Sequence, residues 1–432
     1  MVISTLTLFL IICLTCLLLY FRGNGKRGQL PPGPRPLPIL GNMLDLDIKD
    51  MVKSLLTLRE KFGSVFTIYM GSQPTVVLCG YKTVKKALVD QGEEFSGRGD
   101  MPVIFRFTQG DGIALSNGEK WKVLRRFAIQ TLRNFGMGKR SIEERIQEEA
   151  KCLVKELEQT KGEPFDPTFL IGCSFSNVIC SIVFGDRFDY KDEKFLTLVG
   201  LINDNFRLFN SPFAQEKENP QSYFHTDTIV MTTHNLFFAG TETVSTTLRF
   251  AILILMKYPE IEAKVHEEIT RVIGSQRSPS FEDRAQTPYT EAVIHEIQRF
   301  IDIFSMGIPH AVTKDTHFQG FVLPKGTNIM PFLHSVHYDP TQFKNPQKFD
   351  PAHFLNEKGE FRRNDAFMPF SAGKRLCLGE ALARMEMFVF FVTLLQRFTF
   401  RPTCPPEEID VSPLLSGLGN VPRPYKVQVI PR

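Results

Sequence analysis

The segment Phe370–Gly379 reads Phe-Ser-Ala-Gly-Lys-Arg-Leu-Cys-Leu-Gly, and it places Cys377 in a glycine-punctuated loop just before an apolar helical stretch. A metal-bound cysteine is a thiolate, and the N-terminus of a helix lowers the pKa of a nearby cysteine. Backbone N–H groups in such a turn can also donate hydrogen bonds to the sulfur. This setting suits a cysteine that binds a metal as a thiolate.

Two glycines and an arginine of the same loop also suit a cofactor-binding site. Gly373 and Gly379 permit a tight backbone and the close approach of a flat macrocycle. Arg375 can pair with a carboxylate. Leaving Arg375 aside, a Phe, a Gly, a Cys and a Gly at these spacings are expected by chance roughly 0.003 times in a chain of this composition.

This loop is similar to the haem-binding signature of cytochromes P-450, Phe-x-x-Gly-x-Arg-x-Cys-x-Gly. The resemblance implies a mainly α protein with small β-sheets, the cytochrome P-450 fold, and a haem cofactor. It also implies that Cys377 is the axial thiolate and that Arg375 binds a haem propionate. The resemblance spans nearly the whole chain and is closest to vertebrate family 2, around its A, F and G subfamilies.

Composition excludes several other classes of protein. The net charge of +4 and the absence of a long basic run argue against a nucleic-acid-binding protein. With 43% hydrophobic and 23% charged residues, a folded chain is expected rather than a disordered one. The 39 phenylalanines predict a Phe-rich core, with a few of them lining an apolar ligand cavity.

The eight cysteines show neither zinc-ligand spacing nor a C-x-x-C pair. Most of them are expected to be reduced, buried and apolar in behaviour, as in a cytosolic environment. They are Cys13, Cys16, Cys79, Cys152, Cys173, Cys180, Cys377 and Cys404.

The N-terminus predicts a single transmembrane helix. Val2–Phe21 carries no charge, and a helix of this length spans ~30 Å, the thickness of a bilayer core. Arg22, Lys26 and Arg27 follow at once, so the rest of the chain is expected in the cytosol. The competing interpretation is a cleaved signal peptide, but no basic n-region or small-residue cleavage site is evident.

Three regions are expected along the chain. Residues 1–21 are the membrane anchor, and residues 22–38 are a basic and Pro-rich hinge. The hinge contains Pro31–Pro38, whose prolines make a stiff extended spacer. Residues 39–432 are the haem-binding catalytic domain.

The periodicity of apolar residues predicts mostly helices and no internal repeat. Two hairpins are expected, one over 64–78 and one over 317–330 that turns at Pro324–Gly326. Short strands are expected after Phe400. The predicted helices cover 116–133, 142–160, 226–258, 259–273, 288–300 and 379–398.

Glu296 and Arg299 lie three residues apart on a predicted helix. That spacing alone describes a common surface ion pair of little energetic value. The resemblance instead implies the Glu-x-x-Arg pair that locks a loop on the proximal side of the haem. His353 would be its partner there, in a position where many family members have Arg.

The segment Ala239–Thr243 places an acid and hydroxyls inside the longest apolar helix. Such groups are costly there unless they face a polar site. The resemblance implies the oxygen-activation motif, in which Thr243 would stabilise the iron-bound hydroperoxide and Glu242 would help to relay protons. The small residues at 239 and 240 would leave room for a diatomic ligand. The alternative is a helix kink capped by threonine hydroxyls.

Further residues match the family's haem and substrate contacts. Trp121 and Arg125 lie one helical turn apart, and both are implied to reach the haem propionates, as are Arg98 and His310. Small aromatic or lipophilic substrates are implied by the apolar residues at pocket positions. These positions are Phe105, Phe107, Phe206, Phe209, Asn235, Phe238, Ala239, Met306, Ile308 and Leu418.

The resemblance implies NADPH-dependent monooxygenation of an apolar compound by O₂. No flavin or dinucleotide fingerprint is evident, so electrons are expected from NADPH–cytochrome P-450 reductase, with cytochrome b5 as an additional candidate. A basic face would dock the reductase, although an ordinary solvated helix face explains it equally well. Its residues are Lys120, Lys122, Arg126 and Arg133.

The chain departs from the family pattern in one place. Helix F of the family is expected from near Leu201 to Phe213, and 214–224 then leads almost directly into the oxygen-activation helix. The F–G loop, helix G and helix H, roughly fifty to sixty residues, are missing between them. Two hypotheses follow: a working monooxygenase with a shortened pocket roof, or an impaired or non-catalytic haem-binding isoform. A haem-thiolate isomerase is a third reading, but it would not need Glu242 and Thr243.

Overall fold

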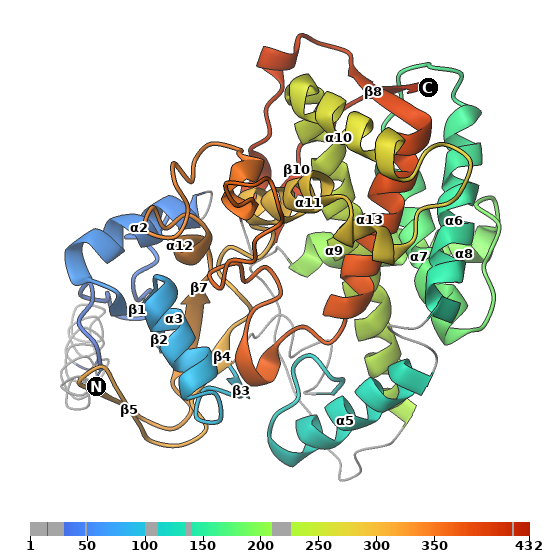
Figure 1. The fold of residues 1–432 in the computed structure, drawn as a ribbon. Helices are drawn as coiled ribbons and strands as arrows, with labels where there is room; N and C mark the ends of the chain where they lie inside the picture. Colours follow the sequence, from blue (N-terminus) through green and yellow to red (C-terminus); the bar gives the residue numbers. More distant parts are fainter. Residues whose placement is uncertain are drawn as a thin grey trace, which may run out of the picture. The chain divides into compact units, whose positions relative to one another are not determined.

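The computed structural model describes residues 15, 30–47, 50–99, 111–134, 140–209, 226–416 and 419–432 (Figure 1). The predicted anchor therefore lies outside the described residues, apart from Thr15. The chain divides into two compact units. The first comprises residues 1–100, 306–336 and 372–374, and the second comprises 101–305, 337–371 and 375–432.

The first unit is built on a five-stranded sheet of order β1-β2-β7-β4-β3. Only β2 and β7 run parallel, and the other neighbours are antiparallel. Helix α2 (Met51–Phe62) begins at Asp50, whose carboxylate accepts the Lys53 N–H. A small apolar core joins this helix to the sheet through Leu55, Phe66 and Phe332. The strands are β1 (Val65–Met70), β2 (Gln73–Cys79), β3 (Gly97–Arg98), β4 (His310–Ala311) and β7 (Asn328–Phe332).

The predicted first hairpin is confirmed by β1 and β2, but the position of the second turn is wrong. Strands β5 (Thr316–Phe318) and β6 (Phe321–Leu323) pair around Gln319 and Gly320. Both of these residues have positive φ, which suits a two-residue hairpin turn. The segment Pro324–Gly326 instead leads from β6 into β7, which pairs with β2 and not with β6. The first unit also holds α3 (Tyr81–Lys85) and the helical turn Lys86–Asp90.

The second unit is mostly helical. Prolines at the first helical position open both α10 and α11, where the missing N–H costs nothing. Two strand pairs, β8–β11 and β9–β10, complete the unit. The helices are α5 (Gly118–Asn134), α6 (Arg140–Glu158), α7 (Thr168–Val183), α8 (Glu193–Phe209), α9 (Thr226–Lys257), α10 (Pro259–Val272), α11 (Pro288–Ile301) and α13 (Glu380–Arg397), and the strands are β8 (Phe398–Pro402), β9 (Pro413–Ser416), β10 (Asn420–Pro422) and β11 (Val427–Pro431).

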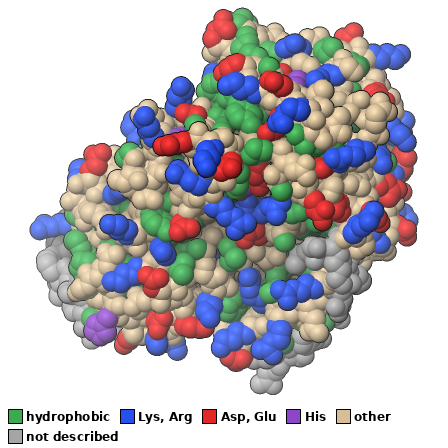
Figure 2. All heavy atoms as spheres, in the orientation of Figure 1, with side chains coloured by type: hydrophobic (Ala, Val, Ile, Leu, Met, Phe, Trp, Pro, Cys, Tyr) green, Lys and Arg blue, Asp and Glu red, His purple; other side chains and the backbone are tan. Residues whose placement is uncertain are grey.

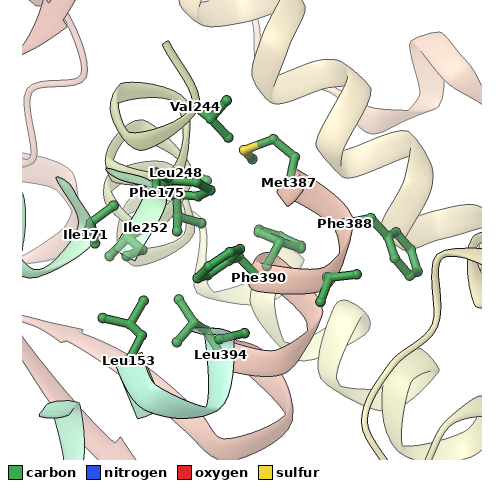
Figure 3. Packing of buried hydrophobic residues seen from close by; sticks show 14 of the residues in the cluster. Leu153, Ile171, Phe175, Val244, Leu248, Ile252, Met387, Phe388, Phe390 and Leu394 are labelled. Atoms are coloured by element: carbon green, nitrogen blue, oxygen red, sulfur yellow. The ribbon is translucent and has the colours of Figure 1, made fainter. Parts of the chain in front are cut away.

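Helix α9 lies in the core of this unit. Its apolar residues belong to one core with those of α6, α7 and α13, and most of the side chains labelled in Figure 3 point into it. The rings of Phe175 and Phe390 lie 4.5 Å apart there. Among the described residues, Met231–Lys257 is the one helical stretch long and apolar enough to cross a membrane, and 78% of its apolar window is buried inside the protein. The burial identifies it as a core helix.

The predicted helices are confirmed to within a few residues, with one correction. Helix α8 begins at Glu193 rather than near Leu201. Asp192 explains the earlier start, because its carboxylate accepts the N–H groups of Lys194 and Phe195 in the manner of an N-cap. Helix α7 was not predicted, since it is apolar on nearly every side and shows no helical periodicity.

The six described cysteines are free, and only Cys79, Cys173 and Cys180 of them are buried. Cys404 is exposed, so the expectation that most cysteines are buried is too broad. On the face drawn in Figure 2, side chains of both charge signs are interspersed, in line with the small net charge.

Candidate functional site

The loop that carries Cys377 ends at the N-terminus of α13. The Cys377 N–H donates to Phe370 O (3.0 Å), and the N–H groups of Gly379 and Glu380 donate to the Cys377 sulfur. The side chain is exposed. The surrounding protein nevertheless desolvates the sulfur enough to raise the pKa of Cys377, while the Gly379 N–H lowers it. The helix N-terminus thus acts in the predicted direction but is outweighed by desolvation.

The two glycines of the loop serve different purposes. Gly373 has φ +71°, and a Cβ there would lie 1.7 Å from Leu88 O, so the backbone of the first unit itself requires glycine. A Cβ at Gly379 would meet no protein atom within 4 Å. Protein packing therefore explains Gly373 and leaves Gly379 unexplained.

Trp121, Arg125 and Arg375, which the resemblance implies are propionate partners, lie close together in the second unit. The Arg375 guanidinium lies 3.8 Å from the centre of the Trp121 ring. Arg125 donates to Leu376 O (2.7 Å), next to the cysteine, and burial lowers the pKa of Arg125. Arg375 also donates to Ser116 O (2.8 Å). Two guanidinium groups and an indole are thus fixed beside the Cys377 loop.

Arg98 and His310 are brought together in the first unit. They are opposite each other in the β3–β4 pair. His310 is buried, and its Nδ1 donates to Phe95 O (2.7 Å). The structure therefore places two of the predicted propionate partners side by side on one sheet.

Glu296 and Arg299 form a fully buried pair, which rules out the surface interpretation. The two side chains are 0% exposed and share two hydrogen bonds of 2.7 Å. Glu296 also accepts the Asp350 N–H (2.9 Å) and pairs with His353 Nδ1 (3.1 Å). Arg299 donates to His337 O (2.9 Å). Glu296, Arg299 and His353 therefore form one buried hydrogen-bonded cluster, called the lock below.

His353 donates from both ring nitrogens, because Lys344 O accepts from Nε2 (2.6 Å) and Glu296 accepts from Nδ1. Burial disfavours its charged form, but the hydrogen bond and charge of Glu296 outweigh that cost and raise the pKa of His353 above 6.5. Donation from both ring nitrogens requires the protonated, positively charged form of the His353 ring.

We expect the contribution of His353 to the free energy of unfolding to decrease as the pH rises. Because the pKa of His353 is higher in the folded state, its protonated ring stabilises the fold fully below pH 6.5. That stabilisation is lost as the pH rises through the folded-state pKa. His353→Arg should remove this loss, on the order of 1 kcal/mol. The measurement is urea unfolding across this range, with the exposed His317→Arg as control. Equal pH slopes for the His353→Arg and unmodified chains would contradict the assignment.

The residues of the Ala239–Thr243 motif face different surroundings on α9. Glu242 is buried, and the Thr243 hydroxyl donates to Ala239 O (2.6 Å), as the capping alternative requires. Thr241 is buried against Ser176 of α7 (3.2 Å). The expectation for Gly240 is wrong, because a Cβ there would lie 2.4 Å from Ile179 Cδ1. Close packing of α9 on α7, and not room for a diatomic ligand, accounts for that glycine.

The predicted pocket residues are described only in part. Asn235 Oδ1 accepts the Ala114 N–H (3.3 Å), and the Phe238 ring stacks on His234. Both residues lie on α9 together with Ala239. Met306 and Ile308 lie in the first unit, where Met306 packs against the small core. Phe105, Phe107 and Leu418, and the side chains of Phe206 and Phe209, lie outside the described residues.

One polar cluster beside the cysteine loop was missed. Arg384 of α13 pairs with Glu380 (2.9 Å) and donates to His295 Nε2 (3.0 Å). His295 Nδ1 donates to Glu291 O, so Nε2 is left as an acceptor, and burial lowers the pKa of His295 to about 3. The spacing of four between Glu380 and Arg384 could have indicated the ion pair, but nothing local indicated His295.

Comparison with known proteins defines the class. The sequence model of the cytochrome P450 family matches residues 31–216 and 213–429. The chain is 53% identical to cytochrome P450 2F2 of Mus musculus, over 93% of this chain and 94% of the relative. It is 52% identical to cytochrome P450 2F1 of Homo sapiens, over 100% and 99%, and 49% identical to cytochrome P450 2G1 of Rattus norvegicus, over 98% of each.

The chain belongs to the cytochrome P450 family of haem-thiolate monooxygenases. Within the family it is a microsomal family 2 member near the F and G subfamilies, and microsomal relatives point to the endoplasmic reticulum membrane. The cofactor of this family is haem with an axial cysteine thiolate, and its electrons come from NADPH through a redox partner.

Proposed function

We propose that this chain oxidises small lipophilic or aromatic compounds with O₂, with Cys377 as the axial ligand of its haem. The observation that carries the proposal is the Cys377 loop, in which the sulfur is accessible and accepts two N–H groups at the start of α13. Haem supplies the oxygen chemistry when bound, and the protein supplies position, protons and exclusion of water.

The residues present fit a haem group. A side chain at Gly379 would meet no protein atom, which suits a position that a flat macrocycle approaches. Arg375, Arg125 and Trp121 offer N–H donors for propionate carboxylates on the same unit as Cys377. We assign Arg98 and His310 the same role. Bound iron would also overcome the desolvation that raises the pKa of Cys377, because a coordinating thiol loses its proton.

Glu242 and Thr243 would deliver protons during O₂ activation. The Thr243 hydroxyl donates to Ala239 O, so its oxygen still has lone pairs for a hydrogen bond from a ligand. Glu242 lies one residue earlier on α9 and is buried, and we assign it to the proton relay. Asn235, Phe238, Ala239, Met306 and Ile308, with the pocket positions outside the described residues, would contact the substrate.

A cytochrome P-450 reductase, with cytochrome b5 as an additional donor, would dock on α5. Lys122, Arg126 and Arg133 are exposed there beside the exposed ring of Phe127. Lys120 is held by an ion pair with Asp111. Exposed cations around an apolar side chain suit an acidic protein partner.

We further propose that the chain lacks the F–G loop to helix H block of its relatives. The alignment with cytochrome P450 2F1 runs over 489 positions but covers a chain of 432 residues, a difference of 57. The family model matches in two pieces that meet at residues 213–216, between α8 and α9. A missing block of this size at this place supports the second hypothesis, an isoform with impaired catalysis. Efficient turnover is the alternative.

The function is tested by reconstituting the purified chain with reductase, NADPH and isotopically labelled O₂ in the presence of a small aromatic compound. One labelled oxygen atom in the organic product is expected. Cys377→Ala should give none. Equal product from the two chains would contradict the proposal.

We propose a single-pass topology with the catalytic body in the cytosol, from Val2–Phe21 and the basic residues that follow it. Protease added to intact microsomes should then digest the body and leave the anchor. Protection of the body until detergent is added would show the reverse orientation or a cleaved signal.

A further inference from the structure

A second buried polar link lies just beyond Glu296 and Arg299, at the C-terminal end of α11. Asp302 ends this helix with φ 45° and ψ 55°, a left-handed conformation that aspartate tolerates. The turn is held by Asn420, whose Nδ2 donates to Asp302 O (3.0 Å) and Ser305 Oγ (2.9 Å). The Asp302 carboxylate is therefore fixed inside the protein, where it is 3% exposed.

This carboxylate faces His337. The distance from Asp302 Oδ1 to His337 Nδ1 is 2.7 Å, and the His337 side chain is 1% exposed. The Met368 N–H donates to His337 Nε2 (3.1 Å). Because Nε2 accepts a hydrogen bond, the ring proton is on Nδ1 and is donated to Asp302. One imidazole thus joins the end of α11 to the segment that leads to the cysteine.

The connection continues to Cys377 through the backbone. Met368 O accepts the Ser371 N–H (3.0 Å), and Phe370 O accepts the Cys377 N–H (3.0 Å). The backbone of His337 is also held in place, since the Arg299 guanidinium donates to His337 O. A shift of Met368 would therefore be transmitted to the residue that carries the sulfur.

We propose that His337 is a positioning residue for the Cys377 thiolate, acting through the Asp302–His337–Met368 link. The proposal rests on the proposed role of Cys377 as haem ligand. An apolar residue at 337 would remove one hydrogen bond from the buried Asp302 carboxylate and the hydrogen bond from the Met368 N–H. The Glu296–Arg299 pair would still hold α11 against Asp350, so the effect should be local to the cysteine segment.

Two variants separate the two hydrogen bonds of the imidazole. His337→Leu removes both. His337→Gln offers a side-chain oxygen near the Nε2 position and can restore the bond from Met368. The exposed His317→Leu is the matched control. Amide hydrogen exchange of the haem-free chains is read at Met368 and Cys377, and the ferrous CO-bound absorption spectrum is read on the haem-loaded chains.

In His337→Leu the Met368 and Cys377 amides should exchange at least about tenfold faster than in the unmodified chain. A larger fraction of the haem should show the spectrum of a lost thiolate. His337→Gln should recover most of both properties, and His317→Leu should change neither. Unchanged exchange would overturn the link, and faster exchange with an unchanged spectrum would overturn its role toward the thiolate. A missing thiolate spectrum in the unmodified chain would instead defeat the proposed function itself.

Discussion

Reconstituted with reductase, the chain should consume NADPH with poor coupling and should release much of the O₂ as peroxide rather than in product. The block of about 57 residues that we propose to be missing between α8 and α9 would otherwise cover the substrate pocket. An open roof admits water, which favours reduction of O₂ over oxidation of the substrate.

The free energy of unfolding should also be lower than in full-length relatives, because the missing block would leave apolar surface uncovered. The described large apolar side chains of α9 are covered in this structure, whereas Leu201 of α8 is exposed. At ~25 cal/mol per Å², leaving even about 400 Å² of apolar surface uncovered on such neighbouring elements would cost about 10 kcal/mol. A whole domain is stabilised by a similar amount. Collapse of α8 toward the gap would recover part of that loss.

The matched comparison is a chimera in which the corresponding segment of cytochrome P450 2F2 of Mus musculus is inserted at residues 213–216. Product, peroxide and NADPH are measured together, with thermal unfolding of both chains. The chimera should raise product per NADPH and the unfolding temperature. Well-coupled turnover by the unmodified chain, at the stability of full-length relatives, would show that the segment is dispensable.

Arg299→Leu should destabilise the second unit by about 3–5 kcal/mol, because it leaves the Glu296 carboxylate buried without its cation. The chain offers a control with the same geometry. Arg277 and Asp283 also form two hydrogen bonds of 2.7 Å, but the Arg277 side chain is 49% exposed. Arg277→Leu should therefore cost about 1 kcal/mol or less.

Urea unfolding of the two variants and of the unmodified chain measures both costs. Similar losses for Arg299→Leu and Arg277→Leu would mean that burial does not set the value of the first pair. The lock would then not be a major contributor to the stability of the second unit.

Local spacing in the sequence was enough to predict two features of the site. Cys377 with its glycines, and Glu296 with Arg299, are set by local spacing, and the structure builds a helix N-terminus and a buried pair from them. Gly240 shows the limit, since its motif suggested ligand space while the residue that it faces, Ile179, lies far away in the sequence.

The link through His337 could not have been predicted in this way. Asp302, His337 and Met368 are each more than thirty residues from the next, and only the fold brings them within hydrogen-bonding distance. The turn at Gln319 and Gly320 was missed for a different reason, because Pro324–Gly326 offered a stronger turn signal nearby and that turn serves another connection.

The central claim is that this chain binds haem through the Cys377 thiolate, and the ferrous CO-bound difference spectrum of the purified chain tests it most directly. We predict the long-wavelength Soret band of thiolate-ligated haem for the unmodified chain. The same band should persist in Cys180→Ala and in Cys404→Ala, and it should be absent from Cys377→Ala. A thiolate band that survives in Cys377→Ala, or no such band in the unmodified chain, would contradict the account.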